Sequence, residues 1–360
     1  MMTNYIERNG VIAFHPGYYI KEIVDESGLT QEDFAKRLDT TPKNLSLLMR
    51  GEQSLSIEMA VKLSRMIGTS IAYWLNIQNA YDTLVAEFQM EDELQAERDT
   101  FKSIDYKYFR DHFRLPDLPR CIDEQIKAVR SFLKVSTLCV LAKRDMAVSF
   151  RSATSELPVQ NTIKANTMVQ IATNKALLVE NAPKYSKDKL VKAVEYILTL
   201  THKHDEFYPL VKKALFEAGV IIVVLPNLSG SKINGATKKI GNNVMLMVND
   251  RCMSADIFWF TLFHEIGHIL DGCFGISFES ESGEKEDLAN EYAANTLIPP
   301  EVYAEFVNDG RFDVCSIKRF AGSINRDPGI VVGRLQREKR VPFNDINLQA
   351  LKPRYKVRIN

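Results

Sequence analysis

Residues 263–270 read F-H-E-I-G-H-I-L and carry the pattern His-Glu-x-x-His inside an apolar stretch. Residues four positions apart lie on one face of a helix, about one turn apart. His264 and His268 would therefore offer two imidazole nitrogens to one metal ion, with the Glu265 carboxylate beside the first. The other interpretation is two ordinary histidines of a buried helix. The chain has only 6 histidines, so chance rarely produces this pattern, and a metal site is the better hypothesis.

The flanking residues predict that this segment is a buried helix. Ser254 is a candidate N-cap, Asp256 follows in the first turn, and Gly272 comes just after the last apolar residue. Apolar side chains cover most of the circumference between them. A buried helix that carries two histidines and a glutamate needs partners for those groups, and a metal ion supplies them.

A second helix, predicted over residues 286–294, offers the third protein ligand that a zinc site of this kind requires. Glu286 is the preferred ligand, and Glu284 and Glu291 are the alternatives because the whole region is rich in acids. Asn290, one turn further on, is placed to hydrogen-bond a ligand histidine. The expected cofactor is one Zn²⁺ per chain, with Mn²⁺ or Fe²⁺ as other candidates.

The two segments resemble the ImmA/IrrE-type metallopeptidases of bacteria and their phages. The resemblance rests on W-F-T-L-F-H-E-I-G-H-I-L (residues 259–270) and E-D-L-A-N-E-Y-A-A-N-T-L-I-P-P (residues 286–300), and it covers roughly residues 200–345. It implies an α+β domain of the gluzincin type, a zincin-like fold. The matching positions are the zinc ligands His264, His268 and Glu286, the general base Glu265, and the aromatic position Tyr292, a candidate to stabilise the transition state.

Near the N-terminus, two short helices joined by a tight turn indicate a helix-turn-helix. Helices are predicted over residues 15–27, 31–38, 43–50 and 57–67, and from residue 70 onward. Thr30 and Thr41 are candidate N-caps, and Ala35 is small where two helices must approach each other. The prediction is a five-helix unit whose third helix enters the major groove of DNA.

The residues expected to contact DNA are the polar ones on and beside that third helix. They are Gln31, Thr41, Lys43, Asn44, Ser46 and Arg50. Residues 1–75 hold 8 Lys or Arg and 9 Asp or Glu, a net charge of −1, which is weak for a DNA-binding domain. The alternative is therefore a helical bundle that binds protein.

The same region resembles HigA-type antitoxins of the XRE helix-turn-helix class. The matching segments are H-P-G-Y-Y-I-K-E-I (residues 15–23), G-L-T-Q-E-D-F-A-K-R-L (residues 28–38) and Y-W-L-N-I-Q-N-A-Y-D (residues 73–82). This resemblance implies a homodimer that regulates transcription by binding operator DNA. It also implies a RelE/HigB-like ribonuclease toxin as a partner, in a toxin-antitoxin system.

The rest of the chain is predicted to be mainly α with a small β-sheet. A long exposed helix, a candidate dimer stalk, is predicted over residues 84–107, and strands over residues 220–225, 236–239 and 243–248. Residues 243–249 are the candidate exposed edge strand for a peptide substrate. An ordinary buried strand is an equally good interpretation of them.

The whole chain is therefore interpreted as a multidomain protein. The expected parts are a helix-turn-helix domain (1–82), a helical connector and dimerisation region (83–205), a metallopeptidase-like domain (206–345) and a basic tail (346–360), of which residues 352–360 are expected to be loosely held. The net charge is zero, no leader or membrane span is recognisable, and the 5 cysteines are scattered. These features predict a cytoplasmic protein with reduced thiols and no membrane partner.

The leading hypothesis for function is a DNA-binding regulator or antitoxin with a zinc metallopeptidase domain. In it, Glu265 activates a zinc-bound water that attacks a peptide bond of an unidentified substrate. The alternative is a non-catalytic, toxin-neutralising antitoxin and autorepressor whose metal domain is a sensor or a structural unit.

Overall fold

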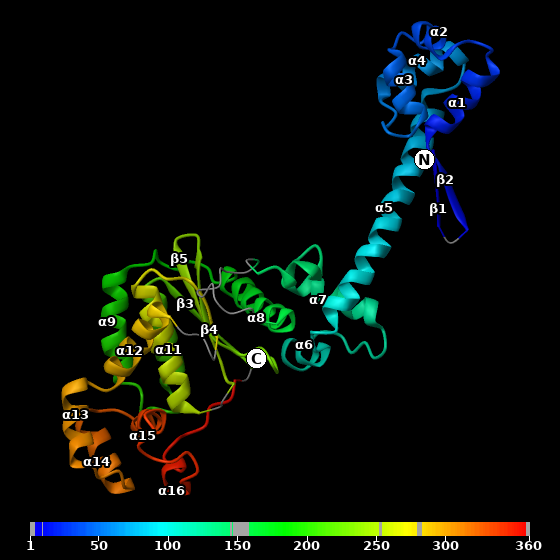
Figure 1. Ribbon diagram of the computed structural model, residues 1–360. Coiled ribbons are helices and arrows are strands. Elements are labelled where there is room, and N and C mark those ends of the chain that lie inside the picture. The colour runs from blue at the N-terminus through cyan, green and yellow to red at the C-terminus, as the bar shows by residue number, and fades with distance from the viewer. Residues whose placement is uncertain are drawn as a thin grey trace. The chain divides into compact units, whose positions relative to one another are not determined.

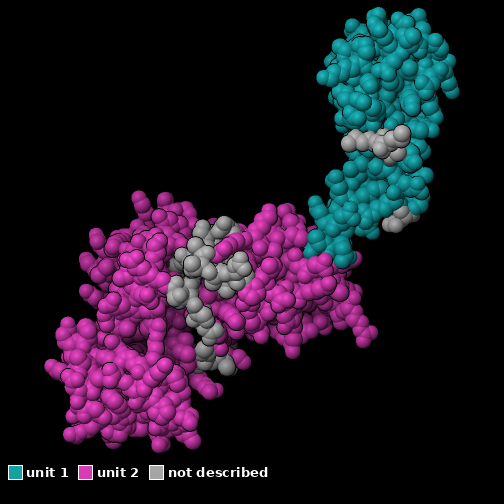
Figure 2. All heavy atoms as spheres, viewed as in Figure 1, with its two compact units in different colours: residues 1–96 teal, residues 97–360 magenta. Residues whose placement is uncertain are grey.

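The computed structural model describes residues 4–8, 10–144, 146, 158–251, 254–278 and 283–357. The chain divides into two compact units, Met1–Ala96 and Glu97–Asn360 (Figure 2). The division falls inside one long helix, α5 (Ile71–Phe101). The other boundaries that the sequence suggested, after residues 82, 205 and 345, stay predictions.

The first unit consists of a short hairpin and a group of helices (Figure 1). Its elements before α5 are β1 (Tyr5–Arg8), β2 (Val11–Phe14), α1 (Pro16–Glu26), α2 (Gln31–Arg37), α3 (Pro42–Met49) and α4 (Ile57–Ile67). The side chains of Thr30 and Thr41 accept hydrogen bonds from backbone N–H groups in the first turns of α2 and α3, as the sequence predicted. The hairpin was not predicted.

The helices of this unit close around a core that includes Phe34, Leu45 and Trp74, each at most 1% exposed. Helix α1 approaches α3 so closely that a Cβ atom on Gly17 would lie 1.9 Å from the carbonyl oxygen of Leu48. Only glycine fits at that position, and the close contact fixes α3 against α1.

The second unit combines helices with one mixed β-sheet. Its helices are α6 (Tyr106–Phe113), α7 (Ile122–Leu133), the 3₁₀ helix η1 (Leu138–Ala142), α8 (Val159–Leu177), α9 (Lys187–Leu198), α10 (Phe207–Glu217), α11 (Ala255–Leu270), α12 (Glu284–Leu297), α13 (Pro300–Asp309), α14 (Val314–Ser323), α15 (Pro328–Arg337) and α16 (Ile346–Gln349). Its strands are β3 (Val220–Leu225), β4 (Ile233–Ile240), β5 (Asn243–Asn249) and β6 (Gly275–Phe278). The stalk helix expected over residues 84–107 is instead the second part of α5, which ends at Phe101, followed by a turn and the start of α6.

The strand order in the sheet is β3-β5-β4-β6, with β3 and β5 parallel and the other pairs antiparallel. Strand β5 is therefore internal, so of the two interpretations of residues 243–249 the buried strand is confirmed and the exposed edge strand is wrong. The parallel pairing with β3 occupies the backbone groups that an added peptide would need. The edges are β3 and β6, and β6 was not predicted.

Helices cover both faces of this sheet. Val220, Ile222 and Leu246 join the core that also contains α11, while α8 packs on the same strands from the other side (Figure 1). Directly paired residues point to the same face. Gly235 is paired with Val248 and Thr237 with Leu246, so both face α11.

The C-terminal segment is held against the start of α11, so the expectation of a loosely held tail is wrong for residues 352–357. The Nζ atom of Lys352 lies 2.7 Å from a carboxylate oxygen of Asp256, and both side chains are at most 9% exposed. The N–H of Ala255 donates to the carbonyl oxygen of Pro353 at 2.8 Å. Residues 358–360 lie outside the described ranges.

Candidate metal centre and helix-turn-helix interface

Helix α11 carries three of the predicted site residues into the interior. His264, Glu265 and His268 are 7%, 0% and 1% exposed. Because the helix is apolar on its other faces and packs on β4 and β5, these polar side chains cannot turn to solvent. Their polar atoms must therefore find partners inside the protein.

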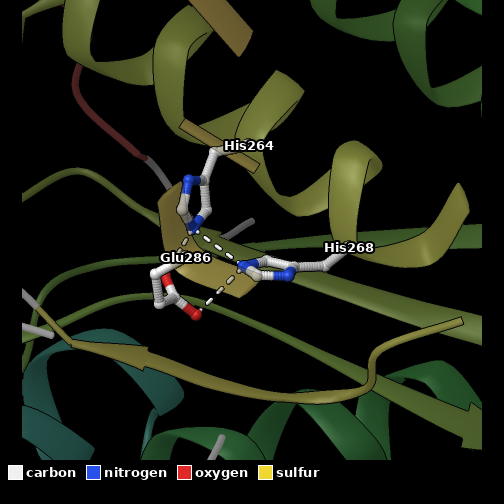
Figure 3. A group of neighbouring side chains, drawn as sticks. All are labelled: His264, His268 and Glu286. Atoms are coloured by element: carbon white, nitrogen blue, oxygen red, sulfur yellow. Dashed lines mark hydrogen bonds and ion pairs between the residues drawn. The ribbon is translucent and has the colours of Figure 1, made fainter. Parts of the chain in front are cut away.

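Helix α12 supplies the fourth residue. Glu286 lies in its first turn and is 5% exposed, and its carboxylate faces both histidines (Figure 3). Packing of α12 on α11 is close, since a Cβ atom on Gly267 would lie 3.0 Å from the Tyr292 ring. Glu284 and Glu291, the alternatives weighed from the sequence, are exposed on the outer face of α12.

Two imidazole nitrogens and the Glu286 carboxylate converge on one point. The Nε2 atoms of His264 and His268 are 3.0 Å apart, and each lies 3.1 Å from an oxygen of Glu286 (Figure 3). Zinc–ligand bonds of 2.0–2.1 Å in a tetrahedral arrangement separate the ligand atoms by about 3.3 Å. The residues present therefore fit a zinc ion with little rearrangement.

The hydrogen bonds around the cluster indicate which atoms carry lone pairs. The Nδ1 atom of His264 lies 3.1 Å from Oδ1 of Asn290, an oxygen that can only accept. The proton of neutral His264 then belongs on Nδ1, which leaves a lone pair on Nε2. That lone pair faces the Glu286 carboxylate, so a proton or a cation must lie between the two. Asn290 takes the position that the sequence predicted for it.

The electrostatics of Glu286 are consistent with a ligand that stays ionised. Burial alone would raise the pKa of its carboxyl group, but hydrogen bonds with His264 and His268 outweigh burial and hold that pKa far below its usual range. A metal ligand must be deprotonated, and a lowered pKa favours the deprotonated form of this carboxyl group.

Glu265 lies next to the ligands and beneath strand β4. A Cβ atom on Gly235 would lie 2.5 Å from Oε1 of Glu265 and 2.7 Å from its Cγ. The strand can pass this close only because residue 235 has no side chain. Sequence reasoning missed Gly235 because the predicted strand began at residue 236, whereas β4 begins at Ile233 and includes this glycine.

The Tyr292 hydroxyl hydrogen-bonds with the Thr296 side chain, and its role in stabilising a transition state stays a prediction. Cys273 is a free thiol that does not belong to the group of metal-ligating side chains, His264, His268 and Glu286, found among the described residues.

The residues predicted to contact DNA fall into two classes. Lys43 and Asn44 are exposed near the start of α3, and neither side chain has an ion pair or hydrogen-bond partner among the described residues. Gln31 instead donates to the carbonyl oxygen of Pro42, the Thr41 hydroxyl caps α3, and Arg50 pairs with Glu52 at 3.2 Å. Ser46 is half-buried. Lys43 and Asn44 are therefore the side chains best placed to reach a ligand.

Comparison with known proteins identifies the class of the first unit. Residues 20–74 match the Helix-turn-helix family model, so the XRE-type helix-turn-helix predicted from the sequence is confirmed. The chain belongs to the helix-turn-helix family through this segment, and helix-turn-helix domains place the second helix of the motif, here α3, in the major groove of DNA.

Particular relatives match the same region. The chain is 42% identical over 72 residues to the uncharacterized HTH-type transcriptional regulator YddM of Escherichia coli (strain K12), which is 20% of this chain and 77% of that protein. Virulence-associated protein I of Dichelobacter nodosus is 32% identical over 81 residues, covering 22% of this chain and 75% of the relative. Virulence-associated protein A' of the same organism is 35% identical over 82 residues, covering 22% and 71%.

No solved structure matches the chain. Among the described residues, no helix is both long and apolar enough to cross a membrane.

Proposed function

We propose that the protein is a transcriptional regulator whose second unit is a zinc-dependent metallopeptidase of the ImmA/IrrE type. The observation that carries the peptidase half is the convergence of His264, His268 and Glu286 within 3.1 Å of one another, beside the buried Glu265. The regulator half is supported by the helix-turn-helix family and by the relative described as a transcriptional regulator.

In this proposal, His264, His268 and Glu286 hold the zinc ion. When bound, zinc supplies Lewis-acid chemistry: it polarises a peptide carbonyl and makes water a stronger nucleophile at neutral pH. Glu265 accepts the proton from the attacking water and returns it to the nitrogen of the leaving amine. Asn290 fixes the ring of His264 through Nδ1, and Gly235 leaves the room in which the Glu265 carboxylate lies.

The peptidase half is tested by removing and restoring the metal. Zinc-loaded protein is expected to release new N-termini from a peptide library made from a bacterial proteome, with mass spectrometry as the readout. A chelator such as 1,10-phenanthroline should stop the release, and added Zn²⁺ should restore it. If bound zinc produces no cleavage, the metal unit is a sensor or structural element, as expected for a non-catalytic antitoxin of the HigA type with a toxin partner.

The regulator half predicts sequence-selective DNA binding that depends on α3. Duplexes selected from a random pool should lose about 1–3 kcal/mol of binding free energy on Asn44→Ala, because an asparagine can pair with adenine through two hydrogen bonds. Lys43→Ala should also weaken binding, and it should lower the salt dependence if its partner is a phosphate. Lys21→Ala removes the same charge from an exposed position on α1 and serves as the control. Equal losses for Lys21→Ala and Lys43→Ala would contradict the assignment.

A further inference from the structure

An arginine lies one aromatic ring away from the metal-ligand cluster. Arg337 is the last residue of α15, and its guanidinium carbon lies 4.3 Å from the centroid of the Phe260 ring. Phe260 lies one turn before His264 on α11, and the two ring centroids are 6.3 Å apart. Helix α15 packs against α11, and the Phe260 ring is partly buried at the edge of the core between them.

The neighbouring arginines of the same segment form ion pairs and hydrogen bonds within the protein. Arg334 and Arg340 both pair with Glu338, at 3.1 and 2.9 Å. Arg334 also donates hydrogen bonds to two backbone carbonyl oxygens beyond its own helix, so its side chain is only 17% exposed.

Arg337 differs because its hydrogen-bonding groups are available. Its side chain is exposed, and within the described ranges no carboxylate and no other acceptor lies within hydrogen-bonding distance of its guanidinium. Contact with the Phe260 ring adds a cation–π attraction that favours one position of the guanidinium. A guanidinium stays protonated at physiological pH and carries five donors in a planar fork.

This combination suits a carboxylate more than any other peptide group. The fork of an arginine binds a carboxylate through two parallel hydrogen bonds, and a guanidinium already held in place loses less freedom on binding. The exposed acids of α12, such as Asp287 and Glu291, lie on the outer face of that helix, away from the face that carries Glu286.

We propose that Arg337 is a specificity-determining residue that binds a carboxylate of the peptide substrate. The substrates are then peptides with an acidic side chain, or with a free C-terminal carboxylate, a short distance along the chain from the bond that is cut. This inference rests on the proposed peptidase function and names the substrate class of the same site.

The test measures binding and not cleavage. Full-length, zinc-loaded Glu265→Gln protein is titrated into fluorescein-labelled alanine-based peptides with amidated C-termini, and fluorescence anisotropy gives the Kd. One set carries a single glutamate at successive positions, a second set carries glutamine at the same positions, and a third carries glutamine with a free C-terminal carboxylate. The titrations are repeated with Arg337→Met and with Arg340→Met, which removes an equal charge three residues away.

If an acidic side chain is recognised, a glutamate peptide is expected to bind roughly tenfold more tightly than its glutamine counterpart. If the C-terminal carboxylate is recognised, the third set is expected to bind roughly tenfold more tightly than the amidated glutamine peptides of the second set. Arg337→Met should abolish the preference, Arg337→Lys should keep part of it, and Arg340→Met should leave it unchanged. Equal zinc content and equal circular dichroism spectra show that the variants fold.

A preference that survives in Arg337→Met, or no measurable difference between the peptide sets, overturns the proposal. That result is separable from failure of the peptidase function itself. If wild-type protein cleaves peptides without any preference for carboxylates, only the role of Arg337 in specificity is refuted. If zinc-loaded protein cleaves no peptide, the peptidase function itself is refuted.

Discussion

Replacing Glu265 with glutamine is expected to lower the rate of peptide hydrolysis by roughly 100- to 10,000-fold while zinc stays bound. Glutamine has nearly the same size as glutamate but cannot accept the proton from water. The side chain is 0% exposed and does not belong to the group of metal-ligating atoms, so its replacement should leave His264, His268 and Glu286 in position. The release of new N-termini per zinc-loaded molecule is the quantity to compare.

The matched control for this variant is Glu291→Gln. Glu291 lies on the exposed face of α12, and its replacement makes the same chemical change a short distance from the site. It should keep wild-type activity. Full hydrolysis by Glu265→Gln would show that another group serves as the base, and loss of zinc in that variant would show that Glu265 is needed for the metal site.

Gly235→Ala is expected to lower kcat by about 100-fold, because misplacing a catalytic group by about 1 Å can cost that much. The added Cβ atom would lie 2.5 Å from Oε1, 2.7 Å from Cγ and 2.8 Å from Cδ of Glu265, so the carboxylate or the strand must move. Strand β4 pairs with β5 on one side and β6 on the other, which leaves the side chain of Glu265 as the part that yields. Zinc content should stay near the wild-type value.

Gly322→Ala is the control for this second variant. Gly322 lies in α14, and a Cβ atom there would meet nothing within 4 Å, so alanine should be neutral or slightly stabilising. If Gly235→Ala has the kcat of the wild type, the close approach of β4 does not position the base. If it loses zinc together with activity, the strand supports the whole cluster and not Glu265 alone.

Local patterns predicted the parts of this protein in which short-range rules dominate. Thr30 and Thr41 mark the starts of α2 and α3 because a capping hydroxyl works within a few residues. The two histidines share a face because helix geometry places them there, and Asn290 could be placed relative to Glu286 by the same rule. Which carboxylate of α12 faces α11 depends on how the two helices pack. The sequence could therefore only rank Glu286 above Glu284 and Glu291.

Long-range pairing explains most of what the sequence analysis missed. A continuous apolar strand does not show which partner lies on each side, so the sequence leaves an edge strand and a buried strand equally open for residues 243–249, and only the fold shows that β3 pairs with them. Lys352 was expected in a loose tail because a lysine near a terminus is usually solvated, and only the fold brings Asp256 to it. Gly235 and Glu265 are thirty residues apart in the chain, so their contact has no local pattern.

The most direct test of the central assignment, a zinc site made by His264, His268 and Glu286, is the metal content of the purified protein. Wild type, Glu265→Gln and His268→Ala would be measured side by side by mass spectrometry after dialysis against a zinc-containing buffer. About one zinc per chain in wild type and Glu265→Gln, with its loss in His268→Ala, is the predicted result. Equal zinc in all three, or none in wild type even after zinc is supplied, would contradict the assignment.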